Sequence, residues 1–269
     1  MIITNLFSQA TQYHNNGEFE KAKALYCQIL KKNPENMDAH YLLATILNIE
    51  KKFLEAEKHL DFVLKDNLKN SDVRLSKGIC LMGQERLSEA QSQILIAIQI
   101  EPNFIEAYFQ LFRVQTSLED RQGALNSLKV LNQLSPNQVE INASLSSLAE
   151  ELLLPDDAEP AYKCLLKLEP ENSKWSCKFG KFLMSLSRFQ EAIKYLQKAV
   201  KLDPNNENAL FNLAVAYQYG GAMTDAIKSY RRVLKVNPKA IGKVVHQLPV
   251  APTGELWLDP KKTIKQLTI

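Results

Sequence analysis

The sequence predicts an all-α protein in which antiparallel helix pairs stack one after another as a solenoid. Three observations predict this fold: a period of 34 residues, small residues at two fixed places in each period, and a proline near the end of almost every period. The period is visible in residues 17–36, GEFEKAKALYCQILKKNPEN, and residues 187–206, SRFQEAIKYLQKAVKLDPNN, which lie five periods apart. Self-similarity at a fixed period of this size is typical of repeat proteins, in which each unit packs only on its neighbours.

Seven blocks without gaps result when the chain is divided every 34 residues from Ile3. The blocks are 3–36, 37–70, 71–104, 105–138, 139–172, 173–206 and 207–240. Position 20 is alanine in every block: Ala22, Ala56, Ala90, Ala124, Ala158, Ala192 and Ala226. Since about one residue in twelve is alanine, agreement in all seven blocks has a chance probability on the order of 10⁻⁷ or less. We therefore expect seven repeats over residues 3–240 and a capping or tail segment over residues 241–269.

Each block contains two runs of apolar residues at helical spacing, separated by a turn such as Gly17 or Gly220-Gly221. Position 8 is small in six blocks, with Phe112 as the exception, and small residues at positions 8 and 20 allow two helices to approach closely. Position 24 is large and apolar in each block: Tyr26, Leu60, Ile94, Leu128, Tyr162, Leu196 and Tyr230. Position 32 ends the second helix with proline in six of the seven blocks: Pro34, Pro102, Pro136, Pro170, Pro204 and Pro238.

This pattern resembles the tetratricopeptide repeat, a 34-residue helix–turn–helix unit with small residues at 8 and 20, an aromatic residue or leucine at 24 and proline at 32. The resemblance covers residues 3–240, close to nine-tenths of the chain. It implies a right-handed superhelical solenoid of antiparallel helix pairs. In this family the first helix of each block lines the concave face, where positions 2, 5, 9, 12 and 13 commonly point.

Blocks four and five depart most from the pattern. Block five has Pro155 at position 17 and Pro160 at position 22. Because proline in a helix interior costs about 3 kcal/mol, we expect the second helix of this block to start late, with Asp156 or Asp157 as its N-cap. A local change of solenoid curvature, either neutral or a functional hinge, is predicted there.

The last 29 residues break the period. Val244, Val245 and Leu248 predict a short helix over the open end of block seven. Asp259-Pro260 is typical of a helix start, and the run Leu256-Trp257-Leu258 predicts either a structural cap or an exposed docking motif.

Composition excludes several classes of protein and gives no sign of chemistry. The net charge of +3 over 269 residues gives no support to nucleic-acid binding, and the four cysteines and four histidines lack metal-ligand spacing. There is no apolar run of about 18 residues, no secretory signal and no catalytic motif such as GxSxG or HExxH. We therefore expect a cytoplasmic protein without a cofactor, a metal, a membrane span or enzymatic activity.

Candidate partner-binding residues follow from the resemblance: all except Lys178, which is at position 6, occupy the concave-face positions. The apolar or aromatic candidates are Phe7, Tyr41, Leu75, Phe109, Phe211 and Tyr219. The cationic candidates are Arg113, Lys174, Lys178 and Lys181, which follow an acidic strip of Asp38, Asp72, Glu106 and Glu140. Apolar groups would bury a partner's side chains, and the change of charge along the groove would set the partner's direction.

The sequence thus predicts a non-catalytic scaffold that binds a protein or peptide segment along its concave groove. Lys174 and Lys178 match only two of five positions of the basic clamp of related co-chaperones, so a chaperone-tail receptor is not supported. Three alternatives stay open: a self-assembling homo-oligomer, an accessory subunit of a glycosyltransferase, sulfotransferase or secretion complex, and a small-molecule enzyme.

Overall fold

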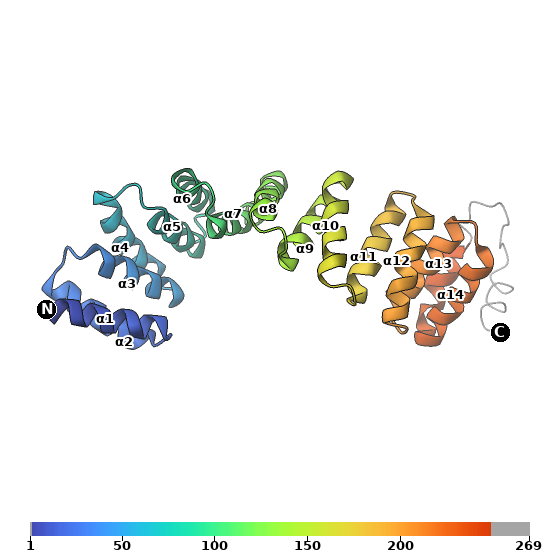
Figure 1. The fold of residues 1–269 in the computed structure, drawn as a ribbon, viewed down its shortest axis with the longest axis horizontal. Coiled ribbons are helices and arrows are strands. Elements are labelled where there is room, and N and C mark those ends of the chain that lie inside the picture. Colours follow the sequence, from blue (N-terminus) through green and yellow to red (C-terminus); the bar gives the residue numbers. More distant parts are fainter. Residues whose placement is uncertain (1, 249–269) are drawn as a thin grey trace. The chain divides into compact units, whose positions relative to one another are not determined.

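The computed structural model describes residues 2–248, with side chains from Asn5 onward, and this part of the chain is helical without strands. The first helices of the successive pairs are α1 (Ile2–Asn15), α3 (Met37–Ile49), α5 (Ser71–Gly83), α7 (Ile105–Ser117), α9 (Val139–Glu151), α11 (Ser173–Ser185) and α13 (Glu207–Tyr219). The second helices are α2 (Phe19–Lys32), α4 (Phe53–Asp66), α6 (Leu87–Ile100), α8 (Arg121–Leu134), α10 (Pro155–Leu168), α12 (Phe189–Leu202) and α14 (Met223–Val236). Figure 1 labels these helices along the chain.

The chain divides into two compact units, Met1–Pro136 and Asn137–Ile269. The first unit contains α1–α8, and the second contains α9–α14 followed by the 3₁₀ turn η1 (Pro238–Ala240) and the short helix α15 (Ile241–Gln247). Within each unit, the two helices of a pair pack on each other and on the helices of the next pair (Figure 1). The boundary falls at the end of block four, two residues before block five begins, and these are the two blocks that depart most from the repeat pattern.

Close packing of the two helices in a pair explains the residues at positions 8, 20 and 24. The seven alanines at position 20 and the seven large residues at position 24 are all buried. A Cβ atom added to Gly78 or Gly180 would lie 2.6 Å from the side chain at position 24, Ile94 or Leu196. The small residue at position 8 therefore makes room for the large residue opposite it.

The turn between the two helices has the same backbone conformation in every pair. Position 15 has a positive φ in all seven blocks, and glycine occupies it only as Gly17 and Gly221. The other five are Lys51, Glu85, Glu119, Leu153 and Ser187, with φ between 57° and 62°. This left-handed region is unfavourable for residues with a Cβ atom by roughly 1–2 kcal/mol, so packing of the helix pair stabilises the turn against its local preference.

Asparagine at the end of a block caps the first helix of the next block. Asn36, Asn70 and Asn206 accept hydrogen bonds from the backbone N–H three residues on, and Asn172 accepts one from Lys174 N–H. These bonds satisfy N–H groups that the helix itself leaves without a partner. The helices of blocks four and five begin after Phe104 and Gln138, which provide no side-chain cap.

The expectation that the second helix of block five starts late is wrong. α10 begins at Pro155, has the same length as the other second helices and has Leu154 at its N-cap. Proline suits the first helical position because the N–H it lacks has no intrahelical partner there. Pro160 lies beyond the first turn, where the helix is retained although the Asp156 carbonyl loses its usual donor. The change of curvature expected near this block stays a prediction.

The end of the second unit carries the short helix α15, in which Val244 is buried, as is Leu248 just after it. Gln218 Nε2 on α13 donates a hydrogen bond to the Gln247 carbonyl oxygen at 3.1 Å. These contacts join α15 to the last helix pair. The expected helix after Asp259-Pro260 and the Leu-Trp-Leu run lie outside the described residues.

Two equivalent ion-pair networks link neighbouring pairs, one in each unit. Arg86 Nη1 lies 2.9 Å from Glu57 Oε1, and Arg188 Nη1 lies 2.5 Å from Glu159 Oε2. Each arginine is at position 16 and each of these glutamates is at position 21 of the preceding block. Arg188, with Lys163 as a second cation, lowers the pKa of Glu159 to about 2, so this carboxylate stays ionised at neutral pH.

His40 and His59 form a pair in the first unit, and a backbone carbonyl oxygen determines which ring nitrogen of His40 carries a proton. The Nδ1 atoms of His40 and His59 lie 2.7 Å apart, and His40 Nε2 lies 2.8 Å from the Pro34 carbonyl oxygen. Because a carbonyl only accepts, His40 Nε2 carries a proton, and neutral His40 then accepts from His59 through Nδ1. Burial, and then the charge of His40, lowers the pKa of His59, while Glu55 acts weakly in the opposite direction.

We expect the first unit to lose stability as the pH falls below neutrality. The folded pKa of His59 lies below the ordinary value of 6.5, so the unfolded chain binds the proton first, and folding becomes less favourable as the pH falls through 6.5 toward the folded pKa. Hydrogen exchange of residues 37–66 at pH 7.5 and pH 5.5, corrected for intrinsic rates, measures the effect. His59→Gln should reduce the difference between the two pH values; an unchanged difference would contradict the assignment.

Candidate functional site

The clearest candidate site in the second unit is a cavity of about 380 Å³ formed by two neighbouring first helices. Glu150 and Glu151 contribute from α9, Lys178 and Lys181 contribute from α11, and Tyr162 of α10 adds its ring. Glu150 and Glu151 occupy positions 12 and 13, and Lys181 occupies position 9, which the family resemblance assigns to the concave face. Ser147, at position 9 of its own block, completes the lining.

Some polar groups of this cavity form hydrogen bonds within the protein, and others are exposed to solvent. Tyr162 Oη donates to Glu150 Oε2 at 2.6 Å. Burial, followed by the neighbouring Glu150, raises the pKa of Tyr162 well above its usual range, so the phenol keeps its proton. Lys178, Lys181 and Glu151 are exposed and form no ion pair with any residue in the described part of the chain. The cavity therefore presents charges of both signs to a ligand.

Lys174 and Lys178 lie on one face of α11 over the indole ring of Trp175. Their Nζ atoms are 4.9 Å and 5.8 Å from the ring centroid. Trp175 is buried, and its Nε1–H donates to Glu169 Oε2 at 2.5 Å. The ring thus supports two cations through favourable cation–π contacts, with both ammonium groups facing solvent.

Of the predicted residues in the first unit, Phe109 and Arg113 are the most accessible. Phe109 is 41% exposed, and Ile105, one turn earlier on α7, is 44% exposed. Arg113 is exposed and donates to Gln110 Oε1 at 2.9 Å. The three predicted lysines all lie in the second unit.

The other predicted aromatic and apolar residues are engaged within the fold. Phe7 and Tyr41 are half-buried against the core of the first unit, and Leu75 is only 5% exposed. Phe211 is 9% exposed because Lys243 of α15 covers its ring at 3.8 Å from the centroid. Tyr219 stacks on Phe189 with 5.3 Å between ring centroids. Leu75 and Phe211 offer little surface to a partner.

Glu150, Glu151 and Tyr162 were not among the residues predicted from the sequence. The repeat pattern places Tyr162 only among the large residues at position 24. A systematic reading of positions 12 and 13 would have found the glutamates, because these positions belong to the same surface. No local signal marks Tyr162, which reaches the cavity from the second helix.

Neither a metal site nor a membrane-spanning helix is seen in residues 2–248. Within that range, no group of three or more His, Cys, Asp or Glu side chains is arranged to hold a metal ion. None of the helices there has both the length and the apolar character needed to cross a membrane.

The fold and this surface define an α-helical repeat protein built from stacked antiparallel helix pairs. Family models described as "TPR repeat" and "Tetratricopeptide repeat" match residues 180–221, 7–61 and 208–240. The chain therefore contains tetratricopeptide repeats, as the pattern of positions 8, 20, 24 and 32 predicts.

Curated relatives are similar over most of this chain but are longer. The chain is 24% identical over 250 residues to Superkiller complex protein 3 of Homo sapiens. This match covers 89% of this chain and 16% of that protein. It is 23% identical over 246 residues to DnaJ homolog subfamily C member 3 of Gallus gallus, covering 80% of this chain and 49% of that protein. The chain thus spans half or less of the length of these relatives.

Solved structures share the fold at low identity. YrrB, described as a TPR protein with an unusual peptide-binding site, matches 70% of this chain and 96% of its own with a TM-score of 0.58 and 16% identity. The structure of Naa15/Naa10 bound to HypK-THB contains a chain that matches 93% of this one, over 39% of its own length, with a TM-score of 0.66 and 21% identity. The tetratricopeptide fold supports a role in protein–protein interaction.

Proposed function

We propose that this chain is a non-catalytic scaffold that binds an extended or helical segment of a partner protein on its first-helix surface. The observation that carries the proposal is the cavity between α9 and α11, where Lys178 and Lys181 face Glu150 and Glu151 across an open space. Charges left without an ion pair in a concave site are suited to a ligand of complementary charge.

The two signs of charge in the cavity favour a partner segment that itself carries both signs. An acidic side chain of the partner would meet Lys178 and Lys181, and a basic side chain would meet Glu151. Such an arrangement fixes the direction of the bound segment, because the reversed segment would place like charges together.

The first unit offers a separate apolar contact of its own. Ile105 and Phe109 lie one turn apart on α7 and are both more than 40% exposed. Two large side chains at this spacing form a strip that can bury apolar groups of a partner helix, at about 25 cal/mol per Å² of apolar surface. YrrB, which shares the fold, is described as having an unusual peptide-binding site, which is consistent with this mode of recognition.

The test is affinity capture from native lysate with the wild-type chain and the Lys178→Glu/Lys181→Glu variant. We expect the variant to retain a specific partner at least about tenfold less well, since two attractive contacts become repulsive. Lys31→Glu/Lys32→Glu is the matched control, because it makes the same change of charge at exposed lysines of α2. Equal retention by all three proteins would refute binding at this cavity.

A further inference from the structure

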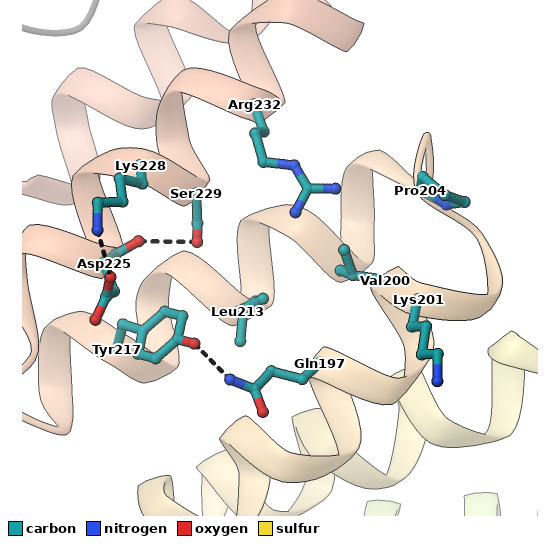
Figure 2. Close-up of a pocket in the computed structure, with 10 residues that line it drawn as sticks. All are labelled: Gln197, Val200, Lys201, Pro204, Leu213, Tyr217, Asp225, Lys228, Ser229 and Arg232. Atoms are coloured by element: carbon teal, nitrogen blue, oxygen red, sulfur yellow. Dashed lines mark hydrogen bonds and ion pairs between the residues drawn. The ribbon is translucent and has the colours of Figure 1, made fainter.

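A second cavity of the second unit, which we call the outer cavity, lies between the second helices α12 and α14. Its volume is about 480 Å³, and Leu213 and Tyr217 of α13 lie between the two helices that flank it (Figure 2). Val200 and Leu213 are buried apolar residues that contribute to its floor. Since α12, α13 and α14 supply all its lining except Pro204 in the loop after α12, it shares no residue with the cavity between α9 and α11.

The polar side chains of this outer cavity fall into two groups. Gln197 Nε2 donates to Tyr217 Oη at 2.6 Å, Lys228 Nζ lies 3.1 Å from Asp225 Oδ1, and Ser229 Oγ donates to the Asp225 carbonyl oxygen at 2.9 Å. These five residues are therefore satisfied within the protein. Lys201 and Arg232 are exposed, and neither forms an ion pair with another described residue. Figure 2 shows the Arg232 guanidinium group extending from α14 toward the middle of the cavity.

The helices that flank the cavity are strongly basic. α12 carries three lysines and one glutamate, and α14 carries four lysines or arginines and one aspartate. The excess of five positive charges on these two helices is larger than the net charge of +3 of the whole chain. This surface therefore attracts anionic groups over some distance, and the cavity provides the place where they can be bound specifically.

We propose that the outer cavity is a second binding site, for an acidic segment of a partner protein that carries one large apolar side chain between carboxylates. The guanidinium group of Arg232 binds a carboxylate through two parallel hydrogen bonds, with Lys201 as a second cation at the rim. The apolar side chain of the segment packs on Val200 and Leu213.

A protein segment fits this site better than a nucleic acid. Single-stranded nucleic acids are bound by basic grooves in which exposed aromatic rings stack on the bases. Tyr217, the one aromatic residue lining this cavity, is half-buried and holds its hydroxyl against Gln197. The buried apolar floor instead offers room for an aliphatic or aromatic side chain.

The experiment is fluorescence anisotropy of a fluorescein-labelled peptide, Gly-Glu-Glu-Leu-Asp-Glu-Gly, titrated with the full chain. We expect Arg232→Glu to weaken binding at least about tenfold and Arg232→Gln to weaken it less. Lys194→Glu is the matched control, because it makes the same change of charge on exposed α12 surface outside the cavity, and we expect a change below about threefold. A peptide with serine in place of leucine should bind at least about fivefold more weakly.

Three outcomes would overturn this proposal. Equal weakening by Arg232→Glu and Lys194→Glu, or equal binding of the leucine and serine peptides, would leave only diffuse attraction between charges. Tighter binding of a labelled thymidine 20-mer than of the peptide, lost in Arg232→Glu, would assign the surface to nucleic acid. A concentration-dependent dimer that Arg232→Glu abolishes would assign it to a second copy of the chain. The Lys178→Glu/Lys181→Glu variant should bind the peptide normally, which separates this site from the first-helix surface.

Discussion

Phe179→Ala is expected to destabilise the second unit by about 3–5 kcal/mol, the usual cost of removing a buried aromatic side chain. Phe179 is 1% exposed and packs on three other rings, with centroid distances of 5.7 Å to Tyr162, 6.1 Å to Phe182 and 4.7 Å to Tyr195. Alanine would leave a cavity that these rigid rings cannot fill by small movements. Alanine also suits a helix, so the loss reports packing rather than backbone preference.

Hydrogen exchange measured by mass spectrometry would locate the effect. Amides in residues 137–248 should lose protection, whereas those in residues 2–136 should change little, because Phe179 and the three rings that contact it all lie in the second unit. Val236→Ala is the control within the second unit, since this apolar side chain is already 40% exposed. Equal loss of protection in both ranges would contradict the division into two units.

Gly180→Leu is expected to destabilise the same unit by about 3 kcal/mol through overpacking. The added Cβ atom would lie 2.6 Å from Cγ of Leu196, which is fully buried and has no room to move away. The expected loss outweighs the gain of up to about 1 kcal/mol that a helix receives when glycine is replaced by a better helix former.

Chemical denaturation of the purified variants, followed by circular dichroism, measures this loss. Gly242→Ala is the matched control: it also replaces a helical glycine, but its added Cβ meets no atom within 4 Å, so we expect stability to be unchanged or slightly raised. Adding Leu196→Ala to Gly180→Leu should recover part of the stability, because it opens the space that the new side chain needs. Simple additivity of the two losses would refute the close contact between positions 8 and 24.

Most of the fold could be predicted from the sequence because each structural role in a repeat recurs at a fixed position. Alanine at position 20 is buried in all seven pairs, and the asparagine at the end of a block caps the next helix at four junctions, three of which read Pro-X-Asn. α10 was mispredicted because Pro155 was treated as a helix breaker, although it suits the first position of a helix. The left-handed turn could not be read from composition, since Leu153 and Lys51 adopt it as Gly17 does.

The candidate site could be predicted only in part. Lys178 and Lys181 could be predicted from the sequence because charge is a property of single residues. Their neighbours Glu150 and Tyr162 depend on how α9, α10 and α11 pack, which no single position reveals. The burial of Phe211 follows from Lys243, a residue beyond the repeats. The outer cavity is lined mostly by second helices, whose positions are not among those assigned to the concave face.

The shared conformation of position 15 has a consequence for how such a chain can change over generations. Because lysine, glutamate, leucine, serine and glycine all support the same backbone turn, the path of the chain through a helix pair depends little on the identity of this residue. A duplication that adds one stretch of 34 residues would therefore bring its own correctly shaped turn, and a deletion of one stretch would leave the other turns unchanged. The number of helix pairs, and with it the length of surface offered to a partner, can vary in steps of one block.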